Sequence, residues 1–220
     1  AELVTVSPFQ NSGYGPVEKL GIPIIEGADY MESLPLGRTE WIRFYGMLFG
    51  KEALADSIFR QTEKSYLDLK QLVTADMPHP TVISEKKFGA SWFMPAGDSY
   101  IANMYADAGA DYVFKDLPGA GSTPLAFETV LDRAIHADMW LIKYNQSEDM
   151  TYGDLRAEYA PYENFDAFKN RRIYSCNTGL VPYYEEFPLH PDYLLKDLIW
   201  VFHPELLPGY SPRYYRKMQD

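Results

Sequence analysis

The sequence predicts an α/β fold in which one long helix joins two lobes, with the first lobe only partly present. Three observations support this prediction. Residues 51–73 contain no Gly or Pro and carry apolar residues at helical spacing. A strand, a short helix and a second strand precede them, as in one crossover of a parallel sheet. After them, strands and helices alternate up to residue 202, which is the pattern of a complete α/β domain.

The first lobe is expected to consist of short elements. Apolar, β-branched runs predict strands at residues 2–7 and 22–25. A segment that begins with Pro predicts a helical turn at residues 16–20. Thr39 is expected to cap a helix over residues 40–49, and Gly50 to break the chain after it. Because one crossover cannot make a domain, either partner strands lie upstream or this piece packs on the later part of the chain. The chain begins directly with a strand-like segment, so we expect a mature piece or a fragment.

The long helix presents a mostly apolar stripe. Its members recur at spacings of three and four and are Ala55, Phe59, Thr62, Tyr66, Leu69 and Val73. Two Pro residues at 78 and 80 stop the helix. Periodicity alone leaves two interpretations open: a rigid strut between two bodies, or a long surface helix of one domain. The strand patterns on both sides favour the strut, with a partial lobe over 1–50, a connecting helix over 51–77 and a second lobe over 78–220.

The second lobe is predicted to contain five strands. They lie at residues 81–84, 91–94, 111–114, 139–144 and 172–175. Ser99 or Asp98, Thr123 and Thr151 are expected to cap three of the helices between them, and residues 191–202 form the last helix. Residues 115–122 and the Tyr-rich residues 177–189 are predicted to be loops.

Composition excludes several classes of protein. The net charge of −11 makes the chain a poor nucleic-acid binder. No run of about twenty apolar residues is present, so no membrane-spanning helix is expected. The single Cys176 rules out an intrachain disulfide. The four His residues show no metal-ligand spacing, so neither a metal site nor a cofactor is predicted.

Two short motifs contain residues that could take part in chemistry. The GAGS segment at 119–122 lacks the third Gly of a dinucleotide fingerprint and the Lys of a phosphate loop, so a flexible loop is the better interpretation. Such a loop at the end of a strand still lies where open α/β sheets bind ligands. Cys176 follows a strand and could act as a nucleophile, although a lone Cys is more often a buried small residue.

Several aromatic and basic residues lie in loops or at strand ends. They suit one wall of an aromatic, partly basic cleft, with ordinary packing as the alternative for each. Trp92 and Phe93 cannot both face such a cleft, because side chains alternate along a strand. The predicted ligand-binding set is Tyr14, Lys86, Trp92, Gly121, Tyr144 and Tyr183. Lys87, Arg171 and Arg172 would add positive charge if the fold brings them there.

The order of several sequence segments resembles one known family. The segments are ELVTVSPF at 2–9, VEKLGIPII at 17–25, PLGRTEWIRFYGMLFGKEALADSIF at 35–59, FMPAGDSYIANMYADAGADYVFKD at 93–116, PLAFETVLDRAIHADMWLI at 124–142 and LLKDLIWVFHPELL at 194–207. Together they resemble the periplasmic substrate-binding proteins of ABC importers for iron–siderophore complexes, haem and cobalamin. The resemblance implies two Rossmann-like lobes joined by one long helix, and further N-terminal lobe upstream.

The resemblance also implies a function. The chain would capture an iron complex, as a siderophore or haem, or a corrinoid between its lobes and deliver it to the permease in the inner membrane. No catalysis is implied. The acidic residue with which the second lobe docks on the permease matches Glu128, whereas the first-lobe loop at 11–14 has no matching carboxylate and Glu18 is a poor substitute. The implied location is periplasmic, with or without a lipid anchor carried upstream of this chain.

Two other functions remain open from the residues alone. The first is an α/β-domain enzyme that uses Cys176 or a cofactor, which would lose turnover on Cys176→Ala. The second is a sensor or scaffold lobe without a transport role, which would show no stabilisation by ligand and would tolerate Glu128→Arg.

Overall fold

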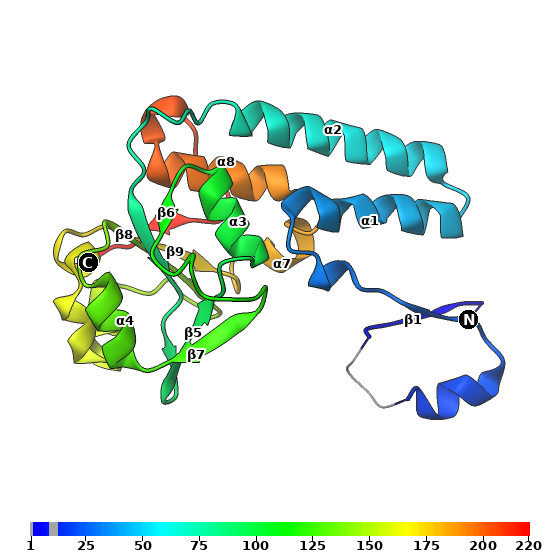
Figure 1. The fold of residues 1–220 in the computed structure, drawn as a ribbon, viewed down its shortest axis with the longest axis horizontal. Coiled ribbons are helices and arrows are strands. Elements are labelled where there is room, and N and C mark those ends of the chain that lie inside the picture. The colour runs from blue at the N-terminus through cyan, green and yellow to red at the C-terminus, as the bar shows by residue number, and fades with distance from the viewer. Residues whose placement is uncertain (1, 9–12) are drawn as a thin grey trace.

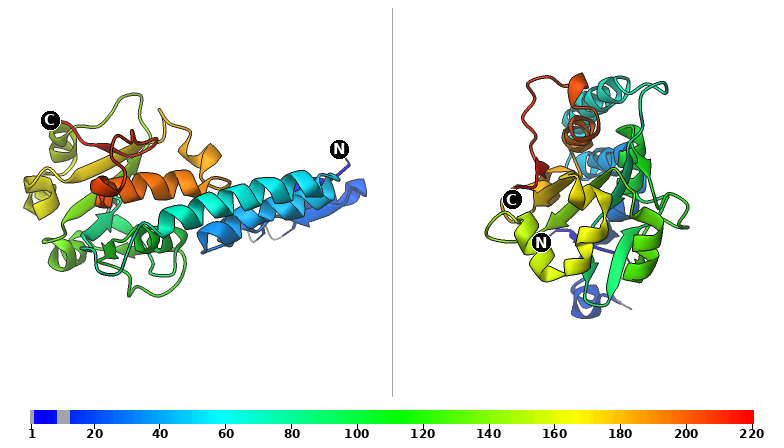
Figure 2. Two further views of the ribbon diagram at one scale, coloured as in Figure 1. Left: turned by 90° about the horizontal axis from the view of Figure 1, so that it is seen from above. Right: turned by 90° about the vertical axis from the view of Figure 1, so that its left-hand side faces the viewer.

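The computed structural model describes residues 2–8 and 13–220 and has the predicted α/β fold (Figure 1). Three parts follow one another along the chain. A small two-stranded unit comes first, a pair of antiparallel helices second, and a larger lobe built on a five-stranded sheet third. Figure 2 shows that the helix pair extends from the larger lobe towards the N-terminal unit.

The N-terminal unit is the predicted parallel crossover. Strands β1 (Val4–Val6) and β2 (Ile24–Glu26) pair in parallel, and the 3-10 helix η1 (Gly15–Leu20) connects them. Gly21 ends η1 with φ +64°, in the left-handed region that Gly adopts at little cost. The short 3-10 helix η2 (Asp29–Met31) then leads to the helix pair.

Helix α1 (Pro35–Leu48) begins earlier than predicted. Its first residue is Pro35, whose missing N–H would have no partner at that position anyway. Thr39 is therefore not a cap, which corrects the prediction. It is fully buried inside α1, and its Oγ1 donates a hydrogen bond to the Pro188 carbonyl at 3.1 Å.

Helix α2 (Glu52–Lys70) is the predicted long helix, and Gly50, with φ +61°, turns the chain into it. A Cβ at Gly46 would lie 2.5 Å from the Ala55 Cβ, so a residue without a side chain lets α1 and α2 approach closely. The predicted stripe is confirmed, since Ala55, Phe59, Thr62 and Tyr66 are its buried residues. The helix does not stand alone, because α1 accompanies its first half and α8 (Pro191–Phe202) its second (Figure 1).

The central sheet of the larger lobe has the strand order β10–β9–β8–β3–β6. Its strands are β3 (Thr81–Ser84), β6 (Asp111–Tyr112), β8 (Met139–Tyr144), β9 (Ile173–Asn177) and β10 (Arg216–Lys217). All pairings are parallel except that of β10 with β9. Helices α2 and α8 lie above this sheet in Figure 1, and the segment from α4 to α6 lies below it. Burial of both faces explains why β8 is apolar along most of its length.

The remaining helices are short and complete the two faces. They are α3 (Tyr100–Asp107), α4 (Phe127–Ala134), α5 (Tyr152–Glu158), η3 (Ala160–Asn164), α6 (Asp166–Lys169), α7 (Tyr183–Glu186) and η4 (Pro204–Leu206). Two predicted caps are confirmed. The Ser99 side chain accepts a hydrogen bond from the Ala102 N–H, and Thr151 forms a full capping box with Asp154. Helix α7 falls within the segment predicted to be a long loop.

A second, antiparallel sheet contains β4 (Lys87–Phe88), β5 (Ser91–Pro95) and β7 (Ser122–Leu125). The prediction that Thr123 caps a helix is wrong, because Thr123 pairs with Met94 inside β7. Pro124 fits there because β7 is an edge strand, where a missing N–H leaves no partner unsatisfied. Helix α4 starts only at Phe127.

Candidate functional site

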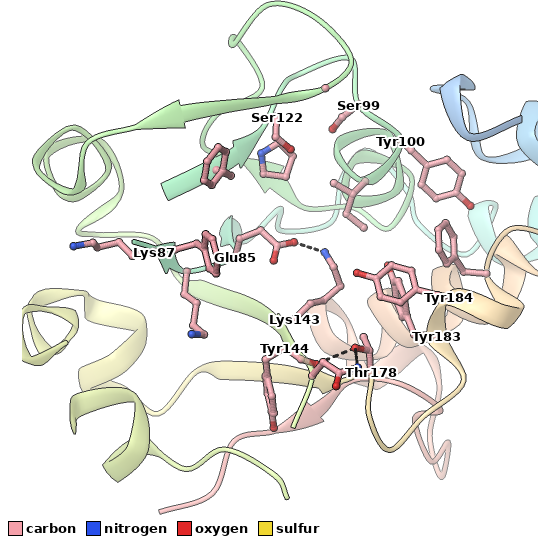
Figure 3. A pocket seen from close by; sticks show the side chains of 18 of the residues that line it. Glu85, Lys87, Ser99, Tyr100, Ser122, Lys143, Tyr144, Thr178, Tyr183 and Tyr184 are labelled. Atoms are coloured by element: carbon pink, nitrogen blue, oxygen red, sulfur yellow. Dashed lines mark hydrogen bonds and ion pairs between the residues drawn. The ribbon is translucent and has the colours of Figure 1, made fainter. Parts of the chain in front are cut away.

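A cleft of about 810 Å³ lies where the carboxyl ends of β3, β8 and β9 meet the small sheet and α7. Figure 3 shows the Glu85 and Lys143 side chains joined near its centre. Ser99 and Ser122 lie on one side of this pair in the view, and Tyr144 and Thr178 on the other. The cleft is thus built from segments far apart in the sequence.

The cleft lies at a change of direction in the sheet. The chain leaves β3 for β6 on one side, and it leaves β8 for β9 on the other side. Neighbouring strands whose connections depart in opposite directions leave a crevice at their carboxyl ends, which is where open α/β sheets bind ligands. Glu85 directly follows β3, and Lys143 is near the end of β8, so both side chains lie at this crevice.

Glu85 has an unusual backbone conformation, with φ +63°. A non-glycine residue in the left-handed region costs about 1–3 kcal/mol when its surroundings hold it there. Here the Glu85 N–H donates to the Leu141 carbonyl at 2.8 Å, and the Trp140 Nε1 donates to the Glu85 carbonyl at 2.6 Å. These two bonds hold the backbone from which the Glu85 side chain departs.

Lys143 forms an ion pair with that carboxylate, in which its Nζ donates to the Glu85 Oε1. Only 16% of the Lys143 side chain and 22% of the Glu85 side chain are exposed. Burial is the largest single effect on the Lys143 ammonium and would lower its pKa. The charge of Glu85 and its hydrogen bond, together with the nearby Tyr183 and Tyr105, outweigh burial and hold that pKa well above its usual value. Lys143 is therefore a permanent cation on the floor of the cleft.

Three further cations line the cleft. Lys86, a predicted binding residue, donates to both carboxylate oxygens of Glu158 at 2.5 and 2.6 Å. The Lys87 ammonium lies 4.1 Å from the centre of the Tyr159 ring. The Arg38 guanidinium lies over the Phe187 ring. Glu85 is the one carboxylate among the described residues that line the cleft, so its surface is cationic although the whole chain is acidic.

Arg171 and Arg172, by contrast, do not line the cleft. Arg171 pairs with Asp220 at 2.7 Å and covers the Tyr152 ring. The fold therefore brings together the charges near residues 86 and 87 but not those near residue 171.

Aromatic side chains form much of the cleft wall. Tyr144 and Tyr183, both in the predicted set, line it and are largely buried. The Tyr144 hydroxyl accepts a hydrogen bond from the Met150 N–H at 2.7 Å, which fixes its ring. Phe88, Phe93 and Tyr184 also line the cleft and are 79%, 45% and 59% exposed. Exposed aromatic groups of this size around a concave site suit a large, partly apolar ligand.

Gly121 also lines the cleft, as predicted for the GAGS loop. The loop is held against the turn before α3, because the Ala96 N–H donates to the Gly121 carbonyl at 2.8 Å and the Asp98 N–H to the Gly119 carbonyl at 3.1 Å. A Cβ at Gly97 would lie 1.9 Å from the Lys115 carbonyl oxygen, so only Gly permits this close approach. The loop is thus a fixed rim of the cleft.

Trp92 is a correction to the predicted set. Its side chain is fully buried, packs against Trp140 and Phe165, and donates from Nε1 to the Ser84 carbonyl. Side chains alternate along β5, so the neighbouring Phe93 lines the cleft instead. We therefore replace Trp92 by Phe93 among the candidate binding residues.

Tyr14 is a second correction. It belongs to the N-terminal unit, where its hydroxyl donates to the Glu26 carboxylate and its N–H donates to Glu18. It does not line the cleft. The part of the predicted first-lobe docking loop before it, at residues 11 and 12, lies outside the described residues.

Glu128 is exposed in the first turn of α4. No ion pair involves it in the described part of the chain. A carboxylate in the first turn is favourably placed with respect to the helix dipole, so its position needs no partner for stability.

The candidate residues for catalysis or metal binding, Cys176 and the four His residues, do not line the cleft. Cys176 is buried in β9, and burial raises the pKa of its thiol to about 12, so the thiol is protonated at neutral pH. Among the described residues, no three His, Cys, Asp or Glu side chains gather as a metal ion would require. Nor is any helix in residues 2–8 and 13–220 long and apolar enough to cross a bilayer.

Sequence reasoning missed the centre of the site. Glu85 and Lys143 are 58 residues apart, and nothing local indicates that they meet. One signal was available for Lys143, because a charged residue near the end of the otherwise apolar strand 139–144 is unusual. Arg38, Tyr100 and Phe187 were also missed.

Comparison with known proteins identifies the family. The chain matches the family model for periplasmic binding proteins over residues 19–178. It therefore belongs to the periplasmic binding protein family, as its sequence segments indicated. The family and the fold are those of solute-binding proteins rather than enzymes.

Sequence relatives and solved structures agree with this identification. Two uncharacterized lipoproteins of Methanocaldococcus jannaschii are similar in sequence. The first is 30% identical over 203 residues, which cover 91% of this chain and 47% of that protein. The second is 28% identical over 208 residues, which cover 92% of this chain and 52% of that protein. The chain thus spans about half the length of the curated relatives it matches. A TroA-like periplasmic binding protein, FepB, from Veillonella parvula has a TM-score of 0.70 at 18% identity, covering 99% of this chain and 72% of that one.

A second similar structure has a more specific description. The ABC-type Fe3+-hydroxamate transport system from Saccharomonospora viridis has a TM-score of 0.68 at 16% identity, covering 92% of this chain and 69% of that one. At these identities the two solved structures establish the shared fold.

Proposed function

We propose that this chain is the substrate-binding component of an ABC importer, located outside the cytoplasmic membrane. It holds an iron complex, as a siderophore or haem, or a corrinoid in the cleft, and delivers it to the permease. The observation that carries the proposal is the cleft of about 810 Å³ at the direction change of the sheet, in a member of this family. That volume lies in the range of about 300–1,000 Å³ typical of small-molecule sites.

The relatives support the class of ligand and the location. One protein of similar fold is described as part of an Fe3+-hydroxamate transport system, and two relatives are described as lipoproteins. The aromatic and cationic lining of the cleft, with Phe93, Tyr183 and Lys143, suits a large chelate with polar oxygens at its surface.

A thermal-shift screen tests ligand capture. A ligand present at about one hundred times its Kd stabilises the folded state by about 2.7 kcal/mol, which raises the Tm of a chain of this size by about 5–10 °C. Ferric siderophores, haem and cobalamin form the panel. We expect at least one to give this shift, and Phe93→Ala to reduce it. Phe49→Ala, which removes a phenyl ring that is 67% exposed outside the cleft, serves as the matched control. No shift with any of these ligands would contradict the proposal.

We further propose that Glu128 contacts the permease. It is an exposed acidic side chain on a helix of the larger lobe, and an accessible charge of this kind can speed and orient association with a partner of opposite charge. Reversal of its charge places like charges together, which weakens association without altering the cleft.

Transport-coupled ATPase activity with the cognate permease tests this contact. Glu128→Arg should lower the stimulation of ATP hydrolysis by the loaded binding protein, while ligand affinity stays unchanged. Glu52→Arg is the matched control, because Glu52 is also an exposed glutamate in the first turn of a helix. Equal stimulation by the Glu128→Arg variant and the wild type would rule out the docking role.

A further inference from the structure

The Lys143 ammonium has hydrogen-bonding capacity that the protein does not use. An ammonium group has three N–H donors. Among the described residues, Lys143 donates to the Glu85 Oε1 alone. Lys86 differs, since its ammonium is engaged by both oxygens of Glu158. Lys143 also lines the cleft, so its remaining donors can reach a bound molecule.

The surroundings of Lys143 favour a negatively charged ligand. Four cationic side chains and one carboxylate line the cleft, and Glu158 and Asp29, which pair with Lys86 and Arg38, lie outside that lining. These partners offset the charges of Lys86 and Arg38, so the lining keeps its net positive charge through Lys87 and offers unused ammonium donors at Lys143. In a site that excludes part of the water, such charges attract an anion more strongly than at an open surface.

Glu85 keeps Lys143 charged and in place. A buried ammonium without a counter-ion would lose its proton or turn to solvent. The left-handed backbone of Glu85, held by Trp140 and Leu141, places its carboxylate beside the Lys143 ammonium. Strained residues of this kind occur where a site must be organised before its ligand arrives.

We propose that the Lys143 ammonium binds an anionic oxygen of the ligand, and that Glu85 positions it. This inference rests on the proposed function and specifies the class of ligand as a metal chelate that remains negatively charged after the metal is bound. A ferric ion held by three singly charged hydroxamates is neutral, whereas one held by three doubly charged catecholates is an anion. The flat, exposed rings of Phe93 and Tyr184 also suit aromatic catechol groups.

Calorimetric titration with two probes tests the inference, namely ferric enterobactin as the tris-catecholate and ferrichrome as the neutral tris-hydroxamate. We expect the wild type to bind the tris-catecholate more tightly. The decisive variant is Lys143→Met combined with Glu85→Gln, which removes the ion pair without leaving one buried charge. It should weaken tris-catecholate binding roughly 10- to 100-fold, the range for loss of a charge-assisted hydrogen bond. Lys143→Arg, which keeps the charge, should retain most of the affinity.

The matched control is Lys115→Met combined with Asp111→Asn, which removes an ion pair of 2.5 Å outside the cleft and should leave both affinities unchanged. Circular dichroism shows whether each variant is folded. Unchanged tris-catecholate binding by the folded double variant at Lys143 and Glu85 would overturn the role of Lys143 while chelate capture stands. Equal affinity of the wild type for both probes would overturn the charge preference. If the chain bound neither probe nor any other chelate, both the proposed function and this inference would be overturned.

Discussion

The Nε1 of Trp140 lies 2.6 Å from the Glu85 carbonyl oxygen and donates a hydrogen bond to it. Trp140 is fully buried, with its ring packed against Trp92, Tyr162 and Phe165. A residue of the aromatic core thus fixes the backbone of the residue whose carboxylate holds Lys143. The stability of the fold and the geometry of the cleft are linked at this bond.

Replacement of Trp140 by Phe should therefore destabilise the chain and disturb the cleft. The substitution removes the indole donor and leaves a cavity, and we expect a loss of about 2–3 kcal/mol in the free energy of unfolding, measured with urea. Trp200→Phe is the control, because Trp200 is only partly buried and donates no side-chain hydrogen bond among the described residues. Equal losses for the two variants would show that the Trp140 bond contributes nothing of its own.

Asp197 in α8 should be needed to hold the C-terminal segment. Its Oδ1 accepts hydrogen bonds from the Tyr210 hydroxyl at 2.7 Å and the Arg213 N–H at 2.8 Å. Its Oδ2 accepts hydrogen bonds from the Tyr214 N–H at 2.5 Å and the Tyr215 N–H at 2.9 Å. An amide keeps only one of the two acceptor oxygens.

We therefore expect Asp197→Asn to lower the free energy of unfolding by about 2–4 kcal/mol, because buried N–H groups lose their partner. Asp192→Asn tests the specificity of this effect. Asp192 lies in the same helix and is buried, but its Oδ1 has no hydrogen-bond partner in the described part of the chain and only a long contact of 3.8 Å with the His190 Nδ1. A change of under about 1 kcal/mol is expected there. A similar loss in both variants would contradict this explanation.

The free energy of unfolding should decrease in acid, partly because protonation of Glu186 weakens its contact with Arg213. The hydrogen bonds from Arg213 lower the pKa of the Glu186 carboxyl. Burial raises this pKa by less, so it stays below its usual value. Because the folded-state pKa is lower than the unfolded one, this stabilisation is present above pH 4.5 and is lost as the pH falls through the folded-state pKa.

The measurement is the difference in unfolding free energy between the wild type and Glu186→Gln as a function of pH. It should be largest near neutral pH and should shrink towards acid. Glu185→Gln is the control, since Glu185 is exposed and forms no ion pair among the described residues. A difference that is constant between neutral and acidic pH would refute the role of the Arg213 contact.

Cys176 should react slowly with thiol reagents in the native protein. Its side chain is fully buried, and burial raises its pKa to about 12, so almost no thiolate is present at pH 8. We expect labelling by a disulfide reagent only after denaturation, and no change in ligand binding in Cys176→Ala. Rapid labelling of the folded chain would reopen the interpretation of Cys176 as a nucleophile.

The sequence was sufficient for features that depend on local periodicity. The stripe from Ala55 to Tyr66, the last helix at Pro191–Phe202 and the capping box at Thr151 all match the structure. Each is encoded within about twenty residues, so no long-range contact was needed to predict it. The resemblance in the order of segments then led to the family.

Prediction failed where a distant partner decides the structure. Pro124 suited a helix start, but pairing with β5 made its segment an edge strand. Trp92 and Phe93 both suited a cleft, and only the packing of Trp140 against one face of β5 decides which side chain is buried. Glu85 carries no local sign of its left-handed conformation, because its partners lie at residues 140, 141 and 143.

The position of the metal in a crystal of the chain with its ferric chelate tests the central claim most directly. Anomalous scattering at the iron absorption edge locates that atom independently of the surrounding density. We expect one strong peak in the cleft between the small sheet and α7, with a ligand oxygen about 3 Å from the Lys143 Nζ. A peak outside the cleft, or a chelate in the cleft that makes no contact with Lys143, would contradict the account.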